Sequence, residues 1–256
     1  MIDGFTYSDD AISNGHILEI LRMLSPSRAA GVEKVRIGRN HGDGGYVMLN
    51  DFSNITAAYS LGIKDDVTWD LDVAGKGIPI YQYDHTIDAL PCEHHMFHWS
   101  KIGIGDSDPN IPLVPLHELM TRNGHGADCG DLLLKCDIEG HEWRMLATMP
   151  SNMLGKFRQI VIECHGFSHV NQPDYAAIVA EGVRAMTLRH KVVHVHANNN
   201  SAYAIVGGVP VPTTLEFTLA RIDAYDLSPS DEVFPTALDR PCSPHRVDYS
   251  LGRFVF

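Results

Sequence analysis

Three carboxylates follow an apolar run within one short stretch of the sequence, residues 131–146, which reads DLLLKCDIEGHEWRML. The apolar run at its start is typical of a strand buried on both faces in a parallel sheet. The run ends at Asp137, and Glu139 and Glu142 follow on either side of Gly140, which permits a sharp turn into a helical sequence. Ligands of open α/β sheets bind beyond the carboxyl ends of the strands. Acids grouped there repel one another and lose solvation, so we expect them to act on a cation, a ribose or a proton.

A second strand sequence, at residues 157–163, ends in an acid that a histidine follows two positions later, Glu163 and His165. Strand alternation places these two side chains on the same side. Parallel strands deliver Glu163 and Asp137 to one edge of the sheet, where two carboxylates and an imidazole could bind Mg²⁺ or a similar hard cation. Asp137, Glu163 and His165 are therefore a candidate metal site. The structural alternative is that Asp137 caps the following helix and Glu163 pairs with a basic side chain.

A glycine and an acid are spaced as a nucleotide-binding turn requires. Gly62 lies near the end of an apolar strand sequence, residues 57–63, and Asp84 follows the next one, residues 78–83. The glycine lets the backbone approach a ligand, and an acid at this distance can accept hydrogen bonds from ribose hydroxyls. There is one glycine and no full GxGxxG, so a structural turn with a surface acid is the alternative.

Three other polar segments leave a binding role open. Residues 92–98 hold one cysteine, one glutamate and three histidines, but their spacing matches no standard zinc pattern, so we interpret them as a solvated loop. Residues 198–200 are three asparagines, which are typical of a turn and whose amides also suit a polyol. Residues 43–45, Asp-Gly-Gly, are either a hairpin turn or a loop that approaches a ligand with its backbone.

The composition fits a soluble globular protein with one large or two small domains. The 256 residues are 44% hydrophobic and 20% charged, with a net charge of −12. No Lys/Arg-rich run occurs, so nucleic acid and anionic membranes are poor partners. No apolar run has the length of a membrane span, and the N-terminal sequence lacks a secretory pattern. The five cysteines never form CxxC, which favours a reduced, cytoplasmic protein without a disulfide framework.

Strand and helix sequences alternate along most of the chain. We expect strands at residues 57–63, 78–83, 97–104, 132–135, 157–163, 191–197 and 213–221, and helices at residues 67–74, 114–122, 142–146 and 174–189. This alternation predicts one α/β domain with a doubly wound, seven-stranded, mostly parallel sheet and helices on both faces. A helix at residues 11–24 and a hairpin within residues 32–49 form an N-terminal extension over about residues 1–50. Residues 225–256 are expected to form an ordered tail.

Several motifs resemble the FkbM-type methyltransferases, which use S-adenosylmethionine. The three longest are LKCDIEGHE at residues 134–142, YSLGI at residues 59–63 and QIVIECH at residues 159–165. They are similar to the family's LKIDVEGAE signature, its cofactor loop and its fifth strand, although His141 replaces a small residue. Two shorter pieces, DGGY at residues 43–46 and HANN at residues 196–199, resemble a subgroup of methyltransferase-like proteins. The resemblance covers about residues 35–221 and implies the Rossmann-like methyltransferase sheet, of which an antiparallel terminal strand is typical.

The resemblance implies an activity and a set of binding residues. The family transfers methyl groups to oxygen in small metabolites, often sugars. It implies an S-adenosylmethionine-dependent O-methyltransferase whose partner is a small-molecule hydroxyl acceptor, such as a sugar or a glycosylated natural product, and it leaves a homo-oligomer open. The cofactor's methionine end would contact Ser60, Gly62 and Asp66, its ribose Asp84, and its adenine Ile102, Gly103 and Ile104.

An alcohol is a weak nucleophile, so a base or a metal assists its methylation. His165 is the first candidate for the base, followed by His141 and His196, and Asp137 is the candidate catalytic carboxylate. Two other functions compete with this one. The first is a non-catalytic nucleotide- or sugar-binding module derived from a methyltransferase fold, and the second is an NAD-dependent oxidoreductase, which the missing GxGxxG disfavours. Thermal stabilisation by S-adenosylhomocysteine and not by NAD would identify a methyltransferase.

Overall fold

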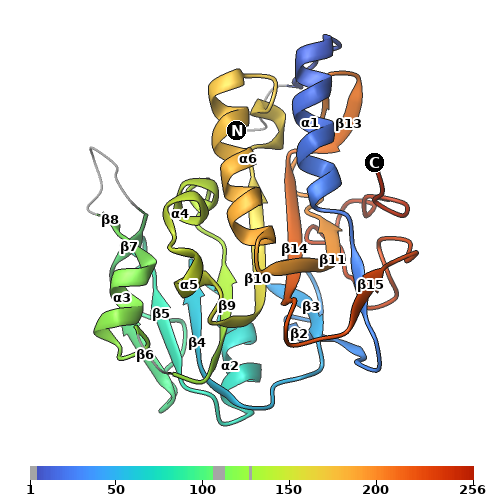
Figure 1. Cartoon of the computed structure of the whole chain (residues 1–256). Coiled ribbons are helices and arrows are strands. Elements are labelled where there is room, and N and C mark those ends of the chain that lie inside the picture. The colour runs from blue at the N-terminus through green and yellow to red at the C-terminus, as the bar shows by residue number, and fades with distance from the viewer. Residues whose placement is uncertain (1–4, 106–112, 127–128) are drawn as a thin grey trace.

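The computed structural model of the protein (Figure 1) describes residues 5–105, 113–126 and 129–256. Its centre is a seven-stranded sheet in the order β11-β14-β10-β9-β4-β5-β6. These strands are β4 (Ile55–Leu61), β5 (Ile80–Tyr83), β6 (Phe97–Ser100), β9 (Asp131–Cys136), β10 (Phe157–His165), β11 (His190–Ala197) and β14 (Thr214–Arg221). All neighbours are parallel except β14, which runs antiparallel to β10 and β11. The predicted Rossmann-like, mostly parallel sheet is confirmed, with its antiparallel strand last of the seven in sequence but not at the edge.

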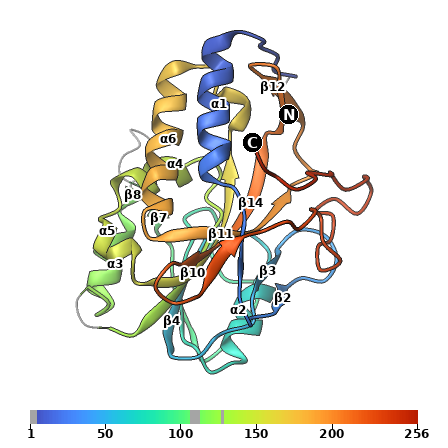
Figure 2. The same cartoon turned by 45° about the vertical axis from the view of Figure 1, so that its right-hand side comes forward.

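Helices cover both faces of this sheet, as predicted. One face carries α1 (Ala11–Met23), α3 (Leu116–Arg122), α4 (Glu142–Thr148), α5 (Ser151–Leu154) and α6 (Pro173–Thr187). The other carries α2 (Thr68–Ala74) and the hairpin of β2 (Lys34–Gly38) and β3 (Gly45–Leu49). Figures 1 and 2 show α1 and α6 side by side, and α2 near the hairpin at the other end of the molecule. Successive residues of a strand point to opposite faces of the sheet and so pack into different hydrophobic cores. On β4, Tyr59 packs under the layer of α1 and α6, and Ala58 packs with Trp69 of α2.

The helical layer follows from local sequence signals. The side chain of Asp10 caps α1 by accepting a 2.9 Å hydrogen bond from the Ser13 N–H. Helix α6 begins with Pro173 in its first turn, where the missing N–H costs nothing. Its buried residues recur at helical spacing and include Ala176, Val179, Val183 and Met186.

The expected strand at residues 97–104 is wrong as a single element. The main-sheet strand β6 stops at Ser100, whose carbonyl accepts a 2.9 Å hydrogen bond from the Ile102 N–H as the chain turns. Beyond the turn, β7 (Gly103–Ile104) pairs in parallel with β8 (Leu113–Val114) in a separate two-stranded sheet. The expected helix at residues 114–122 begins only at Leu116 because Val114 precedes Pro115, which disfavours a helical conformation.

Several short elements were not predicted. The hairpin of β12 (Tyr203–Val206) and β13 (Val209–Pro212) turns at Gly207 and Gly208 and contacts α1. Strand β1 (Ser27–Ala29) pairs with β15 (Leu227–Pro229), and the 3-10 helix η1 (Phe167–His169) follows β10. Among the described helices, none combines the length and the apolar character needed to cross a membrane.

Candidate functional site

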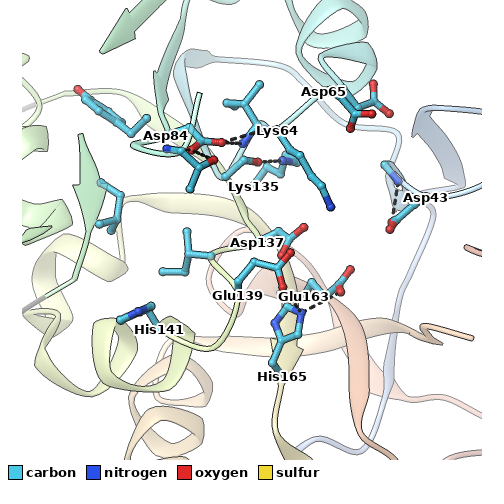
Figure 3. Close-up of a pocket in the computed structure, with 18 of the residues that line it drawn as sticks. Asp43, Lys64, Asp65, Asp84, Lys135, Asp137, Glu139, His141, Glu163 and His165 are labelled. Carbon is cyan, nitrogen blue, oxygen red and sulfur yellow. Dashed lines mark hydrogen bonds and ion pairs between the residues drawn. The ribbon is translucent and has the colours of Figure 1, made fainter. Parts of the chain in front are cut away.

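A pocket of about 690 Å³ opens where β4, β5, β9 and β10 end. Residues at the ends of these four strands and just after them line it, together with the loop of the β2–β3 hairpin and Asn198, Asn200 and Ser201 (Figure 3). The pocket brings together most of the side chains that the sequence singled out, namely Gly62, Asp66, Asp84, Ile102, Gly103, Asp137, His141, Glu163 and His165. The carboxyl edge of the sheet is therefore the candidate site, as the strand-end argument predicted.

Gly62 is needed where the loop after β4 meets the loop after β9. Its φ is +74°, and a Cβ built on it would lie 1.6 Å from the Asp137 carbonyl oxygen. The Gly62 N–H donates to the Tyr83 carbonyl at 3.0 Å, and the Lys135 ammonium donates to the Gly62 carbonyl at 2.6 Å. Both the backbone conformation and the close approach exclude a side chain at this position.

Ser60 does not reach the pocket, so its assignment to the methionine end of the cofactor is corrected. Its side chain is fully buried within the sheet, two residues before the turn. Ser60 pairs with Gln82 on β5 and with Lys135 on β9, and Asp70 of α2 covers this row by accepting a 2.9 Å hydrogen bond from Gln82. A contact with the methionine end of the cofactor would have required Ser60 to lie beyond Leu61, the last residue of β4 that pairs with its neighbours.

Asp84 ties two loops together. One of its oxygens accepts the N–H groups of Ile63 and Lys64, both at 2.8 Å. The other accepts the Thr86 N–H at 2.7 Å and the Thr86 hydroxyl at 2.6 Å. Burial opposes ionisation, but these hydrogen bonds outweigh it and lower the pKa of Asp84. Asp84 lines the pocket with its acceptors already engaged, so the structure gives it a positioning role, and ribose binding stays a prediction.

Asp66 joins the hairpin loop to the start of α2. Its Oδ1 accepts the Thr68 N–H at 2.7 Å, and its Oδ2 lies 2.9 Å from the Arg39 guanidinium. Gly44 approaches so closely that an added Cβ would lie 2.2 Å from Asp66 Oδ2. The Asp-Gly-Gly segment closes the β2–β3 hairpin, and its Asp43 and Gly44 line the pocket, so the two alternatives left open by the sequence are compatible; an approach to a ligand stays a prediction.

The wall near Asp84 is apolar and closely packed. Ile63 and Ile104 are buried, and Ile102 is partly buried. A Cβ added at Gly103 would lie 2.7 Å from the Leu113 side chain. This wall offers flat apolar surface beside polar backbone groups, which suits a heterocyclic ring; the adenine contact itself stays a prediction.

Asp137 and Glu163 place unsatisfied oxygens in the pocket. Asp137 Oδ1 and Glu163 Oε2 are both buried and have no hydrogen-bond partner among the described residues. Burial raises the pKa of Asp137 to about 6, with Lys135 and His165 opposing the shift. Burial and the Asp137 charge raise the pKa of Glu163 well above its usual value. Unpartnered carboxylate oxygens in a buried site indicate a ligand that supplies positive charge or hydrogen-bond donors.

His165 lies among three glutamates. Its Nδ1 is 3.2 Å from Glu142 Oε1, and its Nε2 is 3.2 Å from Glu163 Oε1 and 3.6 Å from Glu139 Oε2. Burial lowers the pKa of His165, but hydrogen bonds to Glu142 and Glu163 raise it to about 11. In this arrangement the neighbouring carboxylates favour the protonated imidazole, and a cation bound at Nε2 would have to displace that proton. The raised pKa weakens His165 as a general base, and its role as base or metal ligand stays a prediction.

The three acids of the DIEGHE sequence have different surroundings. Asp137 faces the pocket, while Glu139 is exposed and adopts a φ of +53°. Glu142 is fully buried, and its carboxylate accepts the N–H groups of Ile138 at 2.9 Å and Gly140 at 3.1 Å. Glu142 thus holds the loop that presents Asp137.

The Asp137, Glu163 and His165 side chains fit a cation site. Their potential ligand atoms all lie within 4.8 Å of one another. Glu142 accepts from Nδ1 of His165, which leaves Nε2 facing Glu163, as in the carboxylate–histidine pairs that orient metal-binding imidazoles. Together with Asp137 Oδ1, a buried oxygen with no hydrogen-bond partner among the described residues, this donor set suits a divalent cation.

The other two candidate histidines lie apart from this group. His141 lines the pocket at the start of α4, and Figure 3 shows it on the far side of the loop from His165. His196 is buried outside the pocket lining, with Nδ1 2.7 Å from Glu216 and Nε2 3.1 Å from Asp248. Burial lowers the pKa of His196, but these carboxylates raise it to about 10, so it is not free to accept a proton.

Asn198 and Tyr46 lie beside Glu163, a placement that the sequence argument did not make for either residue. Asn198 donates to Glu163 Oε1 at 3.0 Å and accepts the Asn200 N–H at 2.8 Å, so it orients the carboxylate and closes a turn. Tyr46 is buried in the pocket wall, and its pKa is raised by burial and then by Asp137 and Glu163, whose charges lie nearby. The DGGY and HANN motifs contained both residues, but spacing alone gave no reason to place them beside Glu163.

The neighbouring Asn199 has a structural role. Its Nδ2 donates to the Ser243 carbonyl at 3.1 Å and the Arg246 carbonyl at 3.3 Å, and its Oδ1 accepts the Ser243 N–H at 2.6 Å. The asparagine run therefore anchors the C-terminal segment next to the pocket. The segment at residues 92–98 does not line the pocket and leads into β6; His94 and His95 have ring centroids 4.4 Å apart and ring planes tilted by 38°.

Comparison with known proteins adds little. No family model matches the sequence. None of the curated proteins matches it. A solved structure, that of a SAM-dependent methyltransferase from Agrobacterium tumefaciens, is 11% identical over 64% of this chain, with a TM-score of 0.34. The match covers 56% of that protein's length. A likeness of this size carries no argument about function, so the FkbM resemblance stays a prediction.

Proposed function

We propose that the protein is an S-adenosylmethionine-dependent O-methyltransferase acting on a hydroxyl of a small polar metabolite such as a sugar. The observation that carries the proposal is the pocket at the carboxyl edge of the sheet, where Asp137 and Glu163 each bury an oxygen that has no partner among the described residues. The sheet order, with antiparallel β14 inserted between β10 and β11, agrees with the architecture that the sequence motifs imply.

One half of the pocket has the properties of a nucleoside subsite. Gly62 brings backbone groups to the surface, Asp84 fixes the N–H groups of the loop after β4, and Ile102 adds an apolar wall. These residues would bind and orient the cofactor, so that its sulfonium faces the acidic half. When bound, S-adenosylmethionine supplies an electrophilic methyl group for in-line transfer, and catalysis depends mainly on holding donor and acceptor together.

The acidic half would hold a divalent cation and the acceptor hydroxyl. Asp137, Glu163 and His165 are the ligands that the geometry offers. When bound, a divalent cation lowers the pKa of a coordinated hydroxyl. The protein's own contribution is orientation, because Glu142 fixes the His165 ring and Asn198 fixes one oxygen of Glu163. Asparagine and serine side chains at residues 198–201 add donors and acceptors suited to a polyol.

Ligand binding and methyl transfer test this proposal in one series. Isothermal titration should show binding of S-adenosylhomocysteine and none of NAD. Labelled S-adenosylmethionine, offered with a panel of sugars and sugar glycosides, should yield a methylated product. Asp137→Asn and Glu163→Gln should retain S-adenosylhomocysteine binding and lose transfer, as should wild type in excess chelator. The exposed acid Asp174 on α6 provides the control, Asp174→Asn, which should behave as wild type.

Failure of S-adenosylhomocysteine to bind the folded protein would overturn the proposal. Binding without transfer to any acceptor would favour a nucleotide-binding module on a methyltransferase-like sheet. Full transfer by Asp137→Asn and by Glu163→Gln would remove the acidic half from the mechanism.

A further inference from the structure

Two buried glutamates face each other on neighbouring strands. Glu163 on β10 and Glu216 on β14 are direct partners in the antiparallel ladder. Their exposed fractions are 4% and 5%. Like charges directly opposite each other destabilise a sheet, and burial adds to the cost. Positive charge beside such a pair offsets this cost, and the imidazoles of His165 beside Glu163 and His196 beside Glu216 supply part of it.

A third carboxylate joins the pair from outside the sheet. Asp43 lies in the loop of the β2–β3 hairpin, and Figure 3 shows it on the side of the pocket next to Glu163. One potential ligand oxygen from each of Asp43, Glu163 and Glu216 lies within 4.8 Å of the others. This group is separate from the Asp137, Glu163 and His165 group except for Glu163, which belongs to both.

The two carboxylate oxygens of Glu163 differ in their hydrogen-bond partners. Its Oε1 accepts from Asn198 at 3.0 Å and lies 3.2 Å from His165 Nε2. Its Oε2 is buried and has no hydrogen-bond partner among the residues that the structure describes. A side chain that is 96% buried would ordinarily satisfy both oxygens, since an unsatisfied buried acceptor costs roughly 1–3 kcal/mol. The free oxygen is an observation independent of the clustering of acids, and it points to a ligand.

The existing partners of Glu216 leave room for a cation. Its Oε2 is 2.7 Å from His196 Nδ1, and its Oε1 accepts a weak hydrogen bond from the Cys242 thiol at 3.3 Å. A carboxylate has about four lone-pair positions, so both oxygens retain acceptor capacity. The contact with His196 orients the Glu216 carboxylate, much as Glu142 orients His165 in the group of Asp137, Glu163 and His165.

We propose that Glu163 bridges two cation positions, the first with Asp137 and His165 and the second with Asp43 and Glu216. The second position has only carboxylate oxygens as protein ligands, a set that suits the hard cations Mg²⁺, Mn²⁺ and Ca²⁺. A bound cation neutralises the repulsion between Glu163 and Glu216 and satisfies Glu163 Oε2. It also fastens the hairpin loop to the sheet, because Asp43 is the only ligand from outside the central strands in this group. The second position does not depend on methyl transfer.

Manganese stoichiometry tests the proposal directly. The full chain is stripped with chelator, desalted and titrated with Mn²⁺, and free Mn²⁺ is measured by its electron paramagnetic resonance signal. Wild type should bind two ions per chain, and spectra of the doubly loaded protein should show coupling between them. Asp43→Asn should bind one ion and lose the coupling, and Glu163→Gln should weaken both positions. The control is Asp65→Asn, because Asp65 is an exposed acid of the pocket rim that belongs to neither group.

The outcomes separate the alternatives. Glu216→Gln should also reduce binding to one ion; if this variant does not fold, Asp43→Asn on the loop decides alone. One Mn²⁺ or none in wild type, or two ions that persist in Asp43→Asn, would overturn the second position. Binding of Zn²⁺ that Mn²⁺ does not reproduce and that Cys242→Ser removes would overturn it in favour of the buried His196, Glu216 and Cys242 group. Two Mn²⁺ ions without S-adenosylhomocysteine binding would leave this inference standing and reject the proposed function. Binding of S-adenosylhomocysteine by a wild type that binds fewer than two Mn²⁺ ions would keep the proposed function and reject this inference.

Discussion

Glu142 Oε1 lies 3.2 Å from His165 Nδ1, and this contact joins the first turn of α4 to the end of β10. The same carboxylate holds the N–H groups of Ile138 and Gly140. One buried side chain therefore fixes both the loop that presents Asp137 and the ring that faces Glu163. The second glutamate of the DIEGHE sequence is a positioning residue, and the pocket's geometry depends on it.

The Glu142→Gln variant should be less stable than wild type. Glutamine can accept one set of N–H groups but loses the charge that supports the contact with His165, so we expect a loss of about 1.5–3 kcal/mol in the free energy of unfolding. Urea unfolding followed by circular dichroism measures it. The matched control is Glu181→Gln on the exposed face of α6, which should change stability by less than about 0.5 kcal/mol. Equal stability of the two variants would show that the Glu142 charge is not needed.

Alanine substitution at two glycines with similar positive φ angles distinguishes the cost of backbone strain from the cost of a steric clash. Gly62 has a φ of +74° and would place a Cβ 1.6 Å from the Asp137 carbonyl oxygen, whereas Gly77 has a φ of +80° and open space around it. Gly77→Ala should cost about 1–2 kcal/mol, the penalty of a left-handed alanine. Gly62→Ala should cost clearly more, or prevent folding, because the two strand-end loops must separate. Similar unfolding free energies for both variants would mean that the loops yield easily.

The fold could be predicted because its signals are local. Continuous apolar runs such as residues 132–134 and 160–162 are the signature of strands buried on both faces, and alternation with helices fixes the class. Gly62 and Asp137 lie at strand ends by sequence alone, so their convergence followed from the parallel arrangement. The break after Ser100 could not be predicted in this way, because the whole run at residues 97–104 has strand composition.

The site chemistry depended on contacts that the sequence does not encode locally. Ser60 was misplaced because the side chains that cover it, Asp70 and Gln82, come from other elements. The raised pKa of His165 follows from neighbouring glutamates, of which only Glu163 is near in sequence. The opposition of Glu163 and Glu216 is a matter of strand register, which hydrophobic pattern alone does not determine.

His190 should make stability depend on pH. It is fully buried at the start of β11, where Nε2 lies 2.7 Å from the Phe157 carbonyl, and burial lowers its pKa from 6.5 to about 4. Between these values the unfolded chain binds more protons than the folded one, so this contribution is complete above pH 6.5 and is lost as pH falls toward 4. The loss approaches about 3 kcal/mol.

A His190→Gln variant removes this dependence while retaining an N–H donor for the Phe157 carbonyl. Urea unfolding at a series of pH values should show that the advantage of wild type over the variant shrinks from neutral toward acid pH. The exposed His245 provides the control, His245→Gln, whose curve should parallel wild type. A constant difference between wild type and His190→Gln across this range would contradict the buried neutral imidazole.

Asp84→Asn distinguishes a loop anchor from a ribose ligand. The Asp84 carboxylate accepts from Ile63, Lys64 and Thr86, and an asparagine amide turned toward either pair of donors would oppose them. Losing these charge-assisted bonds should reduce the free energy of unfolding at pH 7 by about 1.5–3 kcal/mol without any ligand. The folded pKa of Asp84 lies below its usual value, so its contribution is complete above the unfolded pKa and is lost as pH falls through the folded one. The variant and wild type should therefore converge in stability in acid.

Asp88→Asn is the control, because Asp88 is an exposed carboxylate only four residues away. An Asp84→Asn protein as stable as wild type at pH 7, with weaker S-adenosylhomocysteine binding by titration calorimetry, would instead make Asp84 a direct ribose contact.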